Sequence, residues 1–319
     1  MSEESLTLMV VRRREQGNGV AVLDLARRDG GDLPAFEAGA HIDLHLGADL
    51  VRQYSLCGDP ADRRVYRLGI LRDPNSRGGS VAVHDRLREG TEVIAGAPRN
   101  LFPLAGDAAH SILIGGGIGI TPMIAMAHAL HHQGRSFALH YCVRSRDACA
   151  FLDELAEAPF RDRVALHTDD GPAGQRLDLD ALFGSAVAGT HVYVCGPTGF
   201  MEWVIAGAER LGVPAGRIHR EYFQAITDTG GTAFEVVAKR SGKTVQVAAG
   251  QTIVEALAGV GIKVKMSCEQ GVCGTCLCNV LDGTPDHRDV YLTDEEKADN
   301  DQILLCCSRA KSATLVLDL

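Results

Sequence analysis

Several of the chain's ten cysteines have the spacing of iron–sulfur ligands. Cys268, Cys273 and Cys276 form a C-x4-C-x2-C run, and the adjacent pair Cys306 and Cys307 follows farther along the chain. Thiolates hold the iron in such clusters, and this run followed by a distant cysteine is typical of a plant-type [2Fe–2S] site. By spacing alone, either Cys306 or Cys307 could supply the fourth thiolate.

A zinc site is the main alternative for these cysteines. Structural zinc sites more often contain two C-x2-C pairs, and this segment has one. The run also contains Gly271 and Gly274, and glycine lets backbone N–H groups approach inorganic sulfide closely. The pattern therefore favours a [2Fe–2S] cluster. Cys278 alternates with Cys276, so we expect its side chain to face away from the cluster.

A glycine-rich loop predicts a site for a phosphate-bearing ligand. Apolar residues 111–114 lead into the loop GGGIGITP at residues 115–122. Loop N–H groups and the dipole of a following helix both favour phosphate. Thr121 suits a helix cap and Pro122 a first helical turn. The loop lacks the third glycine of the G-x-G-x-x-G fingerprint, because Ile120 stands there, so a plain strand–helix turn is the alternative.

A second glycine turn, Cys195-Gly196-Pro197, ends another apolar strand pattern. Ligands of parallel sheets bind at the carboxyl ends of strands, so the two turns together favour a dinucleotide, and Cys195 could face its nicotinamide. Core packing is the alternative for Cys195. Arg144 and Arg146 come after the strand that follows the first glycine loop. NAD-binding folds usually carry an acid there, so a 2′-phosphate could be accepted.

Two donor-rich segments lie in the first hundred residues. Arg52 and Tyr54 share one face of a predicted strand, and Ser55 lies on the other face or at the strand's end. The turn Arg77-Gly78-Gly79-Ser80 precedes a short helix that contains His84, and such a turn suits one phosphate. Taken alone, both segments could be ordinary barrel and loop residues, and we expect His84 to be structural.

These motifs together resemble the phthalate dioxygenase reductase family of the ferredoxin–NADP reductase superfamily, which includes vanillate demethylase reductase subunits. Arg52-x-Tyr54-Ser55 resembles the flavin motif, and the two glycine turns resemble the nicotinamide motifs. The resemblance covers essentially the whole chain, in the family's motif order. It implies FMN as the flavin, NADH as the electron donor and a separate Rieske-type oxygenase as the acceptor.

The resemblance also implies a role for each candidate residue. Arg52 and the turn Gly78-Gly79-Ser80 should hold the FMN phosphate, Tyr54 should lie along the isoalloxazine ring, and Ser55 should hydrogen-bond near flavin N5. The residues that should line the nicotinamide dinucleotide site are Gly116, Gly117, Thr121, Cys195, Gly196 and Pro197.

Two further segments carry the resemblance toward the C-terminus. Phe223 resembles the aromatic residue that closes the NAD domain over the flavin, with interdomain packing as the alternative. Residues 306–310 read CCSRA, and the family has Cys-Val-Ser-Arg-Ala, which favours Cys306 as the iron ligand beside Cys268, Cys273 and Cys276. The family prefers NADH, whereas Arg144 and Arg146 could accept the 2′-phosphate of NADPH. These arginines could equally contact the pyrophosphate, so we predict NADH as the donor.

Three sequence patterns follow one another along the chain and must position these motifs. Short strand-like runs between turn residues predict a β-barrel with one helix at 81–87. Strands and helices then alternate, which predicts a parallel sheet. A polar linker at 224–232 precedes a hairpin around Ser241-Gly242. We expect a multi-domain protein with a β-barrel flavin domain at 1–104, an α/β NAD-binding domain at 105–226 and a β-grasp plant-type ferredoxin domain at 233–319.

Composition excludes some classes of protein. The net charge of −9 disfavours a nucleic-acid partner, because phosphate binding needs clustered Lys and Arg. Residues 1–15 lack a signal-peptide pattern, and no apolar run of roughly 18 residues predicts a membrane span. We therefore expect a cytoplasmic protein, without disulfides. Residues 282–301 are rich in acids, which predicts a solvated face or a docking surface for a basic partner.

The expected activity is that of an NADH-dependent reductase component of a Rieske-type aromatic oxygenase or demethylase. Hydride would pass from nicotinamide C4 to flavin N5, and single electrons would continue to the cluster. A reductase that serves a cytochrome P450 or another acceptor is one alternative. A redox-sensing or electron-storage module without flavin is an alternative of a different class.

Overall fold

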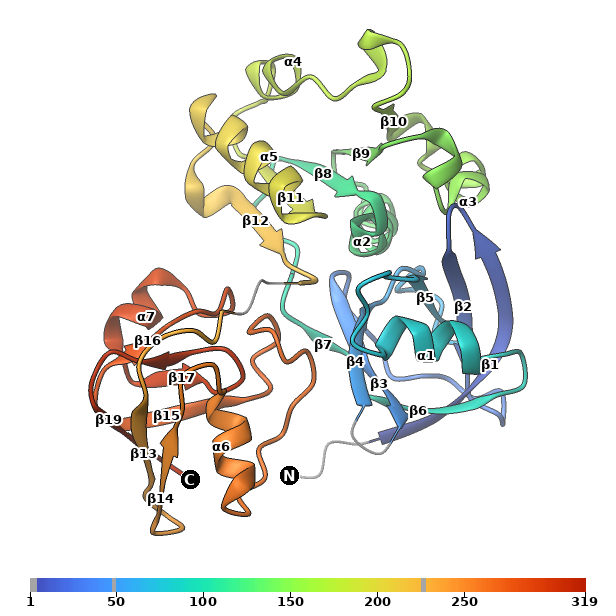
Figure 1. The fold of residues 1–319 in the computed structure, drawn as a ribbon. Coiled ribbons are helices and arrows are strands. Elements are labelled where there is room, and N and C mark those ends of the chain that lie inside the picture. The colour runs from blue at the N-terminus through green and yellow to red at the C-terminus, as the bar shows by residue number, and fades with distance from the viewer. Residues whose placement is uncertain (1–4, 48–49, 225–227) are drawn as a thin grey trace. The chain divides into compact units, whose positions relative to one another are not determined.

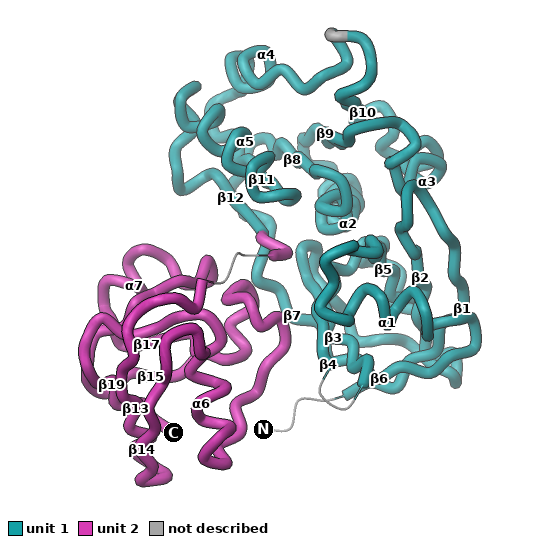
Figure 2. The backbone as a smooth tube through the Cα atoms, viewed as in Figure 1, with its two compact units in different colours: residues 1–221 teal, residues 222–319 magenta. Residues whose placement is uncertain are grey.

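The computed structural model describes residues 5–47, 50–224 and 228–319, which fall into two compact units, Met1–Glu221 and Tyr222–Leu319 (Figure 2). The first unit contains an antiparallel and a parallel sheet, and the second contains the cysteine-rich segment (Figure 1). The three sheets confirm the predicted multi-domain fold class, while the predicted domain limits stay a prediction. The predicted linker is described only in part, because residues 225–227 lie outside the described ranges. None of the described helices is long and apolar enough to cross a membrane.

The first domain is an antiparallel sheet that closes on itself. Its strands follow the order β4-β3-β6-β1-β2-β5, with β7 paired to β3. Just after β4, an antiparallel bridge joins Leu56 to Leu68 of β5, so the two outer strands meet and the predicted barrel is confirmed. The elements are β1 (Ser5–Gln16), β2 (Val20–Ala26), β3 (Ala40–Gly47), β4 (Leu50–Ser55), β5 (Tyr66–Leu71), α1 (Gly79–Arg86), β6 (Glu92–Gly96) and β7 (Arg99–Asn100).

The second domain is a parallel sheet in the order β10-β9-β8-β11-β12. The strand order reverses between β8 and β11, and open sheets of this kind bind ligands at such a switch point. The strands are β8 (His110–Gly116), β9 (Phe137–Val143), β10 (Val164–Thr168), β11 (Thr190–Cys195) and β12 (Ile218–Glu221). The helices are α2 (Ile120–His132), α3 (Leu152–Glu157), α4 (Leu179–Gly184) and α5 (Thr198–Arg210).

Helix α2 packs between this sheet and the barrel. Its first eight residues are all buried, because the helix contacts β8 and β9 and also meets two barrel glycines. A Cβ added at Gly69 would lie 2.9 Å from Thr121 Cγ2 and 2.6 Å from Phe151 Cζ. A Cβ added at Gly39 would lie 3.1 Å from Met126 Cε. The barrel therefore needs glycine where the second domain packs against it.

The second unit has the mixed sheet of a β-grasp domain, in the order β14-β13-β19-β15-β17. Strands β13 and β14 form the predicted hairpin, β19 adds parallel to β13, and β15 runs antiparallel to β19 and β17. The elements are β13 (Phe234–Ala238), β14 (Lys243–Val247), α6 (Ile253–Gly259), β15 (Leu277–Asp282), β16 (Pro285–Asp286), α7 (Asp294–Asp299), β17 (Gln302–Leu304), β18 (Arg309–Ala310) and β19 (Thr314–Leu317).

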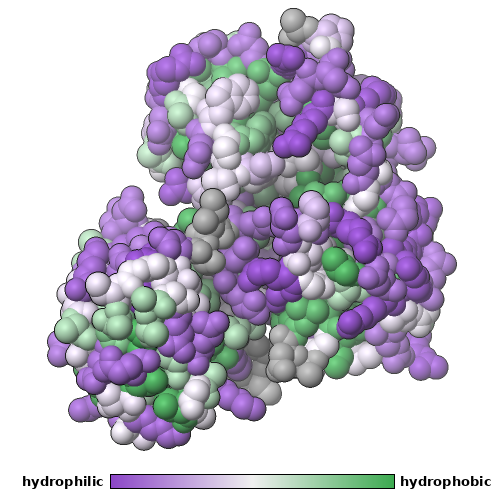
Figure 3. Space-filling model, viewed as in Figure 1, coloured by the Kyte–Doolittle hydropathy of each residue, from purple (hydrophilic) through white to green (hydrophobic). Residues whose placement is uncertain are grey.

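Helix α6 supplies one side of the core of this unit. A capping box between Thr252 and Glu255 starts the helix, which satisfies two of its unpaired N–H groups. Its apolar residues Ile253 and Leu257 are fully buried in the same cluster as Cys276 and Cys306. The cysteine segment therefore lies on a packed core. On the face seen in Figure 3, hydrophilic residues cover most of the surface, with hydrophobic residues scattered among them.

Candidate functional site

Four buried cysteine sulfurs come together in the second unit. Hydrogen-bond contacts link Cys268 to Cys273 and Cys306, and Cys276 to Cys306. The contacts with Cys273 and Cys306 lower the pKa of Cys268, and the Gln270 N–H donates to its sulfur at 3.4 Å. Iron binds thiolates, so the donor set and its N–H groups fit the expected cluster.

Cys307 has different surroundings, although it also contacts Cys306. Its sulfur lies 3.9 Å from Leu304 O and 3.8 Å from Ser308 Oγ. A Cβ added at Gly271 would lie 2.5 Å from the same sulfur, so Cys307 packs directly beneath the loop. The Cys307 side chain therefore supports the loop backbone, while Cys306 joins the other three sulfurs.

Two glycines of the cysteine loop combine a left-handed backbone conformation with close packing. Gly271 and Gly274 both have φ of +71°, in the left-handed region that other residues rarely adopt. A Cβ added at Gly274 would lie 2.4 Å from Tyr291 Cζ. Both glycines are therefore required by the backbone conformation and by close packing.

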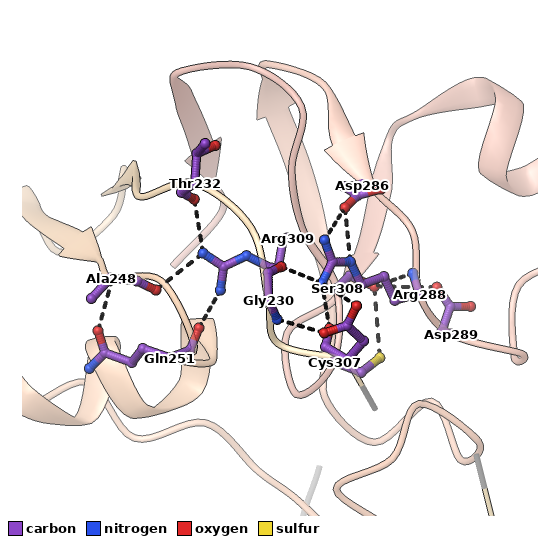
Figure 4. Close-up of polar contacts among 11 residues, drawn as sticks. Gly230, Thr232, Ala248, Gln251, Asp286, Arg288, Asp289, Cys307, Ser308 and Arg309 are labelled. Atoms are coloured by element: carbon purple, nitrogen blue, oxygen red, sulfur yellow. Dashed lines mark hydrogen bonds and ion pairs between the residues drawn. The ribbon is translucent and has the colours of Figure 1, made fainter. Parts of the chain in front are cut away.

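A polar network holds Ser308, two residues after Cys306, against Arg288 and Asp289 (Figure 4). The Ser308 hydroxyl accepts from the Arg288 N–H at 3.2 Å and donates to Asp289 Oδ1 at 3.4 Å. The other oxygen of Asp289 accepts from the N–H groups of Tyr291 and Leu292. Asp289 is thus a buried structural acid rather than part of an exposed acidic face, which corrects the sequence reading of residues 282–301 at that position.

Arg309 adds a second set of bonds to this network (Figure 4). Its guanidinium donates to the backbone carbonyls of Gln251, Ala248 and Thr232 at 2.6, 3.1 and 3.0 Å. It also lies 5.0 Å from the centre of the Phe234 ring. This buried arginine joins the loop before α6 to the segment before β13, and so stabilises the scaffold that carries the cysteines.

The two glycine turns of the parallel sheet lie against each other. Gly115 and Cys195 are partners in the β8–β11 ladder, and a Cβ added at Gly119 would lie 2.3 Å from Cys195 O. Likewise, a Cβ added at Gly116 would lie 2.7 Å from Phe200 Cδ1. At Gly117, whose φ is +55°, an added Cβ would meet no atom within 4 Å, so this part of the loop leaves room for a ligand.

The predicted cap at Thr121 is wrong. A 3-10 turn over Gly117–Gly119 precedes α2, which begins at Ile120, one residue before Thr121. The Thr121 hydroxyl donates instead to Ile118 O at 2.9 Å. Thr121 therefore closes the glycine turn, and no side chain caps the helix.

Ser55 and Cys195, which come from different domains, meet at a residue that sequence reasoning missed. Ser55 Oγ donates to Glu221 Oε2 at 3.3 Å, and Glu221 is the ladder partner of Cys195. Burial raises the pKa of Glu221 to about 8, partly offset by the Ser55 bond. Burial and the Glu221 carboxylate also raise the pKa of Cys195. The sequence signal that could have identified Glu221 is an acidic residue directly before Tyr222 and Phe223, at the end of a strand.

The remaining predicted residues are placed as follows. Phe223 belongs to the second unit, so its closing of the flavin site stays a prediction. Gly196 and Pro197 follow Cys195 directly, and Pro197 precedes α5. Arg144 and Arg146 are exposed after β9.

The expected phosphate residues of the barrel are adjacent. A Cβ added at Gly79 would lie 2.4 Å from Arg52 Cγ, and Arg52 donates to Arg77 O at 3.0 Å. Gly78 has φ of +89° and precedes the first residue of α1, while Ser80 Oγ accepts from the Asp73 N–H. The Arg52 side chain therefore packs against the start of α1, and a guanidinium beside a helix start suits an anion.

Two neighbours complete the description of the barrel site. Burial raises the pKa of Tyr54, and the charge of nearby Arg52 opposes that shift. His84 contacts Ile70 O at 2.9 Å inside the barrel, so it has the structural role expected of it.

The fold and these sites define a class of protein: an NAD(P)H-dependent oxidoreductase with a flavin domain, an NAD-binding domain and a [2Fe–2S] ferredoxin domain. Residues 236–311 match the family model of the 2Fe-2S iron-sulfur cluster binding domain, and residues 113–205 match the oxidoreductase NAD-binding domain. The chain is 49% identical to the vanillate O-demethylase oxidoreductase of Pseudomonas sp. (strain HR199 / DSM 7063), over 98% of this chain and 100% of that protein.

Solved structures of related proteins match the chain over nearly its whole length. The structure of phthalate dioxygenase reductase matches with a TM-score of 0.77 and 39% identity, over 99% of this chain and 98% of that one. An intact type IV self-sufficient cytochrome P450 monooxygenase matches with a TM-score of 0.85 and 39% identity, over 99% of this chain and 41% of that one. The chain belongs to the phthalate dioxygenase reductase and vanillate O-demethylase oxidoreductase family, the reductase components of oxygenases and demethylases.

Proposed function

We propose that this chain is the NADH-dependent reductase of a Rieske-type aromatic oxygenase or demethylase, with FMN and a [2Fe–2S] cluster as its cofactors. The observation that carries the proposal is the meeting of Ser55 and Cys195 at Glu221, which joins the flavin motif to the nicotinamide turn. The same chain continues into the four-thiol domain. The proposed domain limits remain 1–104, 105–226 and 233–319.

FMN is the flavin that the barrel residues favour. Arg52 and the turn Gly78-Gly79-Ser80 make one compact anion site, and FMN ends in a single phosphate. Charge-assisted bonds from a guanidinium are among the strongest that a phosphate can accept. Tyr54, on the same strand face as Arg52, would lie along the flavin ring, and Ser55 would lie near N5.

Each residue has a task that its chemistry allows. The cofactors, when bound, supply the two-electron and one-electron chemistry. Ser55 and Glu221 hold a hydrogen bond at the domain boundary and keep that boundary neutral around pH 7. Cys195 is fully buried, and burial raises the pKa of its thiol, so it adds no charge beneath the nicotinamide turn. The glycine turn that contains Gly116 and Gly117, and that the Thr121 hydroxyl closes, would let a dinucleotide approach the protein backbone.

The cluster ligands in this proposal are Cys268, Cys273, Cys276 and Cys306. The mutual contacts of their sulfurs support the assignment, as does the packing of Cys307 against Gly271. The donor is proposed to be NADH. This proposal is tested by comparing kcat/KM for NADH and NADPH, and the value for NADH should be higher. Arg144→Ala and Arg146→Ala should each retain this preference for NADH.

The proposed docking surface for the oxygenase is the acidic first turn of α7. Asp294 and Glu295 are exposed there. Glu296 has a local role, because its carboxylate accepts from the Thr293 N–H at 2.8 Å in a capping box. A partner with a basic patch would therefore meet Asp294 and Glu295, and complementary charges of this kind mainly raise the association rate.

Reconstitution tests the function. The purified holoprotein, supplied with NADH, should support product formation from vanillate by a purified vanillate demethylase oxygenase, and chromatography of the acid-extracted flavin should give FMN. Glu295→Lys should slow this coupling at low salt, with Glu209→Lys, exposed on α5, as the matched control. Extraction of FAD, or of no flavin, would contradict the cofactor assignment.

A reductase for a cytochrome P450 is the second candidate. One observation favours it: essentially the whole chain matches 41% of a self-sufficient P450 monooxygenase at 39% identity. Titration of the same holoprotein against a P450 haem domain and against an oxygenase separates the two candidates. Faster electron transfer to the haem domain would favour the P450 partner.

A further inference from the structure

Three metal-ligating side chains converge away from the sites described above. Asp59 lies in the loop after β4, and His128 and His132 lie one turn apart on α2. Asp59 Oδ2 is 2.8 Å from His132 Nε2 and 3.7 Å from His128 Nδ1. One ligand atom from each residue lies within 4.8 Å of the other two. We propose that Asp59, His128 and His132 bind one divalent transition-metal ion of the zinc type and so link the barrel to α2.

The donor set matches what zinc requires. Two imidazoles and one carboxylate are a common three-ligand set, with the fourth position left for water. Zinc lies about 2.0–2.2 Å from such ligands, which places tetrahedral donors roughly 3.4 Å apart. The separations of 2.8 and 3.7 Å bracket that value, so small side-chain rotations admit the ion. His132 is exposed, which leaves room for a water ligand.

The carboxylate is oriented for single-oxygen binding. Asp59 Oδ1 accepts from the Ala61 N–H at 2.9 Å, and Oδ2 is left facing both imidazoles. His128 packs edge-on against the Phe160 ring, with centroids 4.9 Å apart, so its ring plane is held in place. Two of the three donors are therefore positioned before an ion arrives.

Protonation also favours metal binding near neutral pH. Burial lowers the pKa of His128, with Asp59 opposing the shift and His132, Arg67 and His131 adding to it, which favours the neutral imidazole that a metal ligand needs. Burial would raise the pKa of Asp59, but the bonds from His132 and Ala61 outweigh it and lower that pKa. The nearby charge of Arg67 is balanced by Asp24, which accepts two bonds at 2.6 and 2.9 Å.

An ordinary ion pair is the competing explanation. Asp59 and His132 are both partly exposed, and pairs of that kind contribute little to stability. A pair also needs a protonated His132, whereas a metal site needs two neutral imidazoles. The two explanations therefore differ in their response to zinc and in the ligands that zinc acquires.

Zinc binding to the chelator-treated holoprotein tests the proposal, because loaded cofactors keep the cluster cysteines occupied. Isothermal titration should give one equivalent of Zn²⁺, and zinc K-edge absorption should report nitrogen and oxygen neighbours. His132→Gln and Asp59→Asn should each weaken binding by at least the roughly tenfold that loss of an outer-shell partner costs. His131→Gln, on the same helix, should bind as the wild type does.

Two results would overturn the proposal. The first is equal zinc affinity in the wild type, His132→Gln and Asp59→Asn, and the second is a zinc spectrum dominated by sulfur. The two variants lie on different domains, and flavin content and circular dichroism verify folding before each titration. A loss of affinity in both folded variants, with none in His131→Gln, supports the site.

Discussion

Ser55 Oγ donates a hydrogen bond to Glu221 Oε2 across 3.3 Å and so connects the end of β4 to the end of β12. Burial raises the pKa of Glu221 to about 8, so the carboxyl group keeps its proton at neutral pH. A buried charge at this position would be costly. The boundary between the flavin motif and the nicotinamide turn is therefore held by a neutral acid whose pKa is about 8.

Replacement of Glu221 by Gln should remove a pH dependence. The folded pKa of about 8 exceeds the ordinary value of 4.5, so the folded state binds the additional proton between these values. Stability contributed by this group is therefore greatest at low pH and falls as pH rises toward about 8. Glu221→Gln should flatten that fall, as measured by the thermal midpoint between pH 5 and pH 9.

The same variant should change flavin reduction. The wild-type rate of flavin reduction by NADH, followed by stopped flow, should show an inflection near pH 8 that Glu221→Gln lacks. Ser55→Ala removes the bond that opposes the burial effect, so it should move the inflection to higher pH. An inflection that persists unchanged in Glu221→Gln would assign the titration to another group.

Loss of one cluster thiolate should separate the two halves of the electron path. Cys273→Ser should abolish NADH-dependent reduction of cytochrome c at the cluster, while NADH still bleaches the flavin, because the flavin and NAD domains lie in the other unit. Cys278→Ser is the matched control, since the Cys278 thiol donates to Asn279 O at 3.5 Å. Failure of flavin reduction in folded Cys273→Ser would contradict a linear path.

Much of the fold could be predicted because the sequence patterns agree with the packing. The alternation of strands and helices after the barrel was predicted correctly, because the apolar residues of β8, β9 and β11 are largely buried in the sheet. Strand β12 was missed, because Ile218–Glu221 is largely polar and forms a strand only by pairing with β11. The short strands β16 and β18 likewise depend on pairing with each other.

The candidate site shows the same division. Local motifs were sufficient to find Arg52 and the Gly78-Gly79-Ser80 turn, which the fold brings together. Glu221 was missed because its importance arises from a contact with Ser55, far away in the sequence. The number of acidic residues in 282–301 also did not show which of them have structural roles. Asp289 is buried and Glu296 caps α7, whereas Glu295 is exposed.

Arg52 should determine how tightly the flavin phosphate is held. Loss of a bond to a charged group costs about 1.5–3 kcal/mol, so Arg52→Gln should weaken FMN binding by roughly 10- to 100-fold. Fluorescence titration of the flavin-free protein measures this change. Arg64→Gln is the control, because Arg64 is an exposed barrel arginine paired with Asp62. Equal FMN affinity in Arg52→Gln and wild type would place the phosphate elsewhere.

Gly274 and Gly242 provide a matched pair that separates backbone strain from crowding. Their φ angles are +71° and +66°, so alanine should cost roughly 1–2 kcal/mol of conformational strain at either position. A Cβ at Gly242 would meet no atom within 4 Å, whereas one at Gly274 would lie 2.4 Å from Tyr291 Cζ. Gly242→Ala should therefore keep its cluster absorbance, with a modest drop in the urea midpoint of that absorbance.

Gly274→Ala should lose the cluster at a much lower urea concentration than Gly242→Ala, or fail to assemble it. Adding Tyr291→Ala should recover part of the loss, because the smaller side chain frees the space that the new methyl group needs. Equal urea midpoints for the two single variants would mean that Tyr291 moves aside at little cost, and that the loop needs glycine only for its backbone conformation.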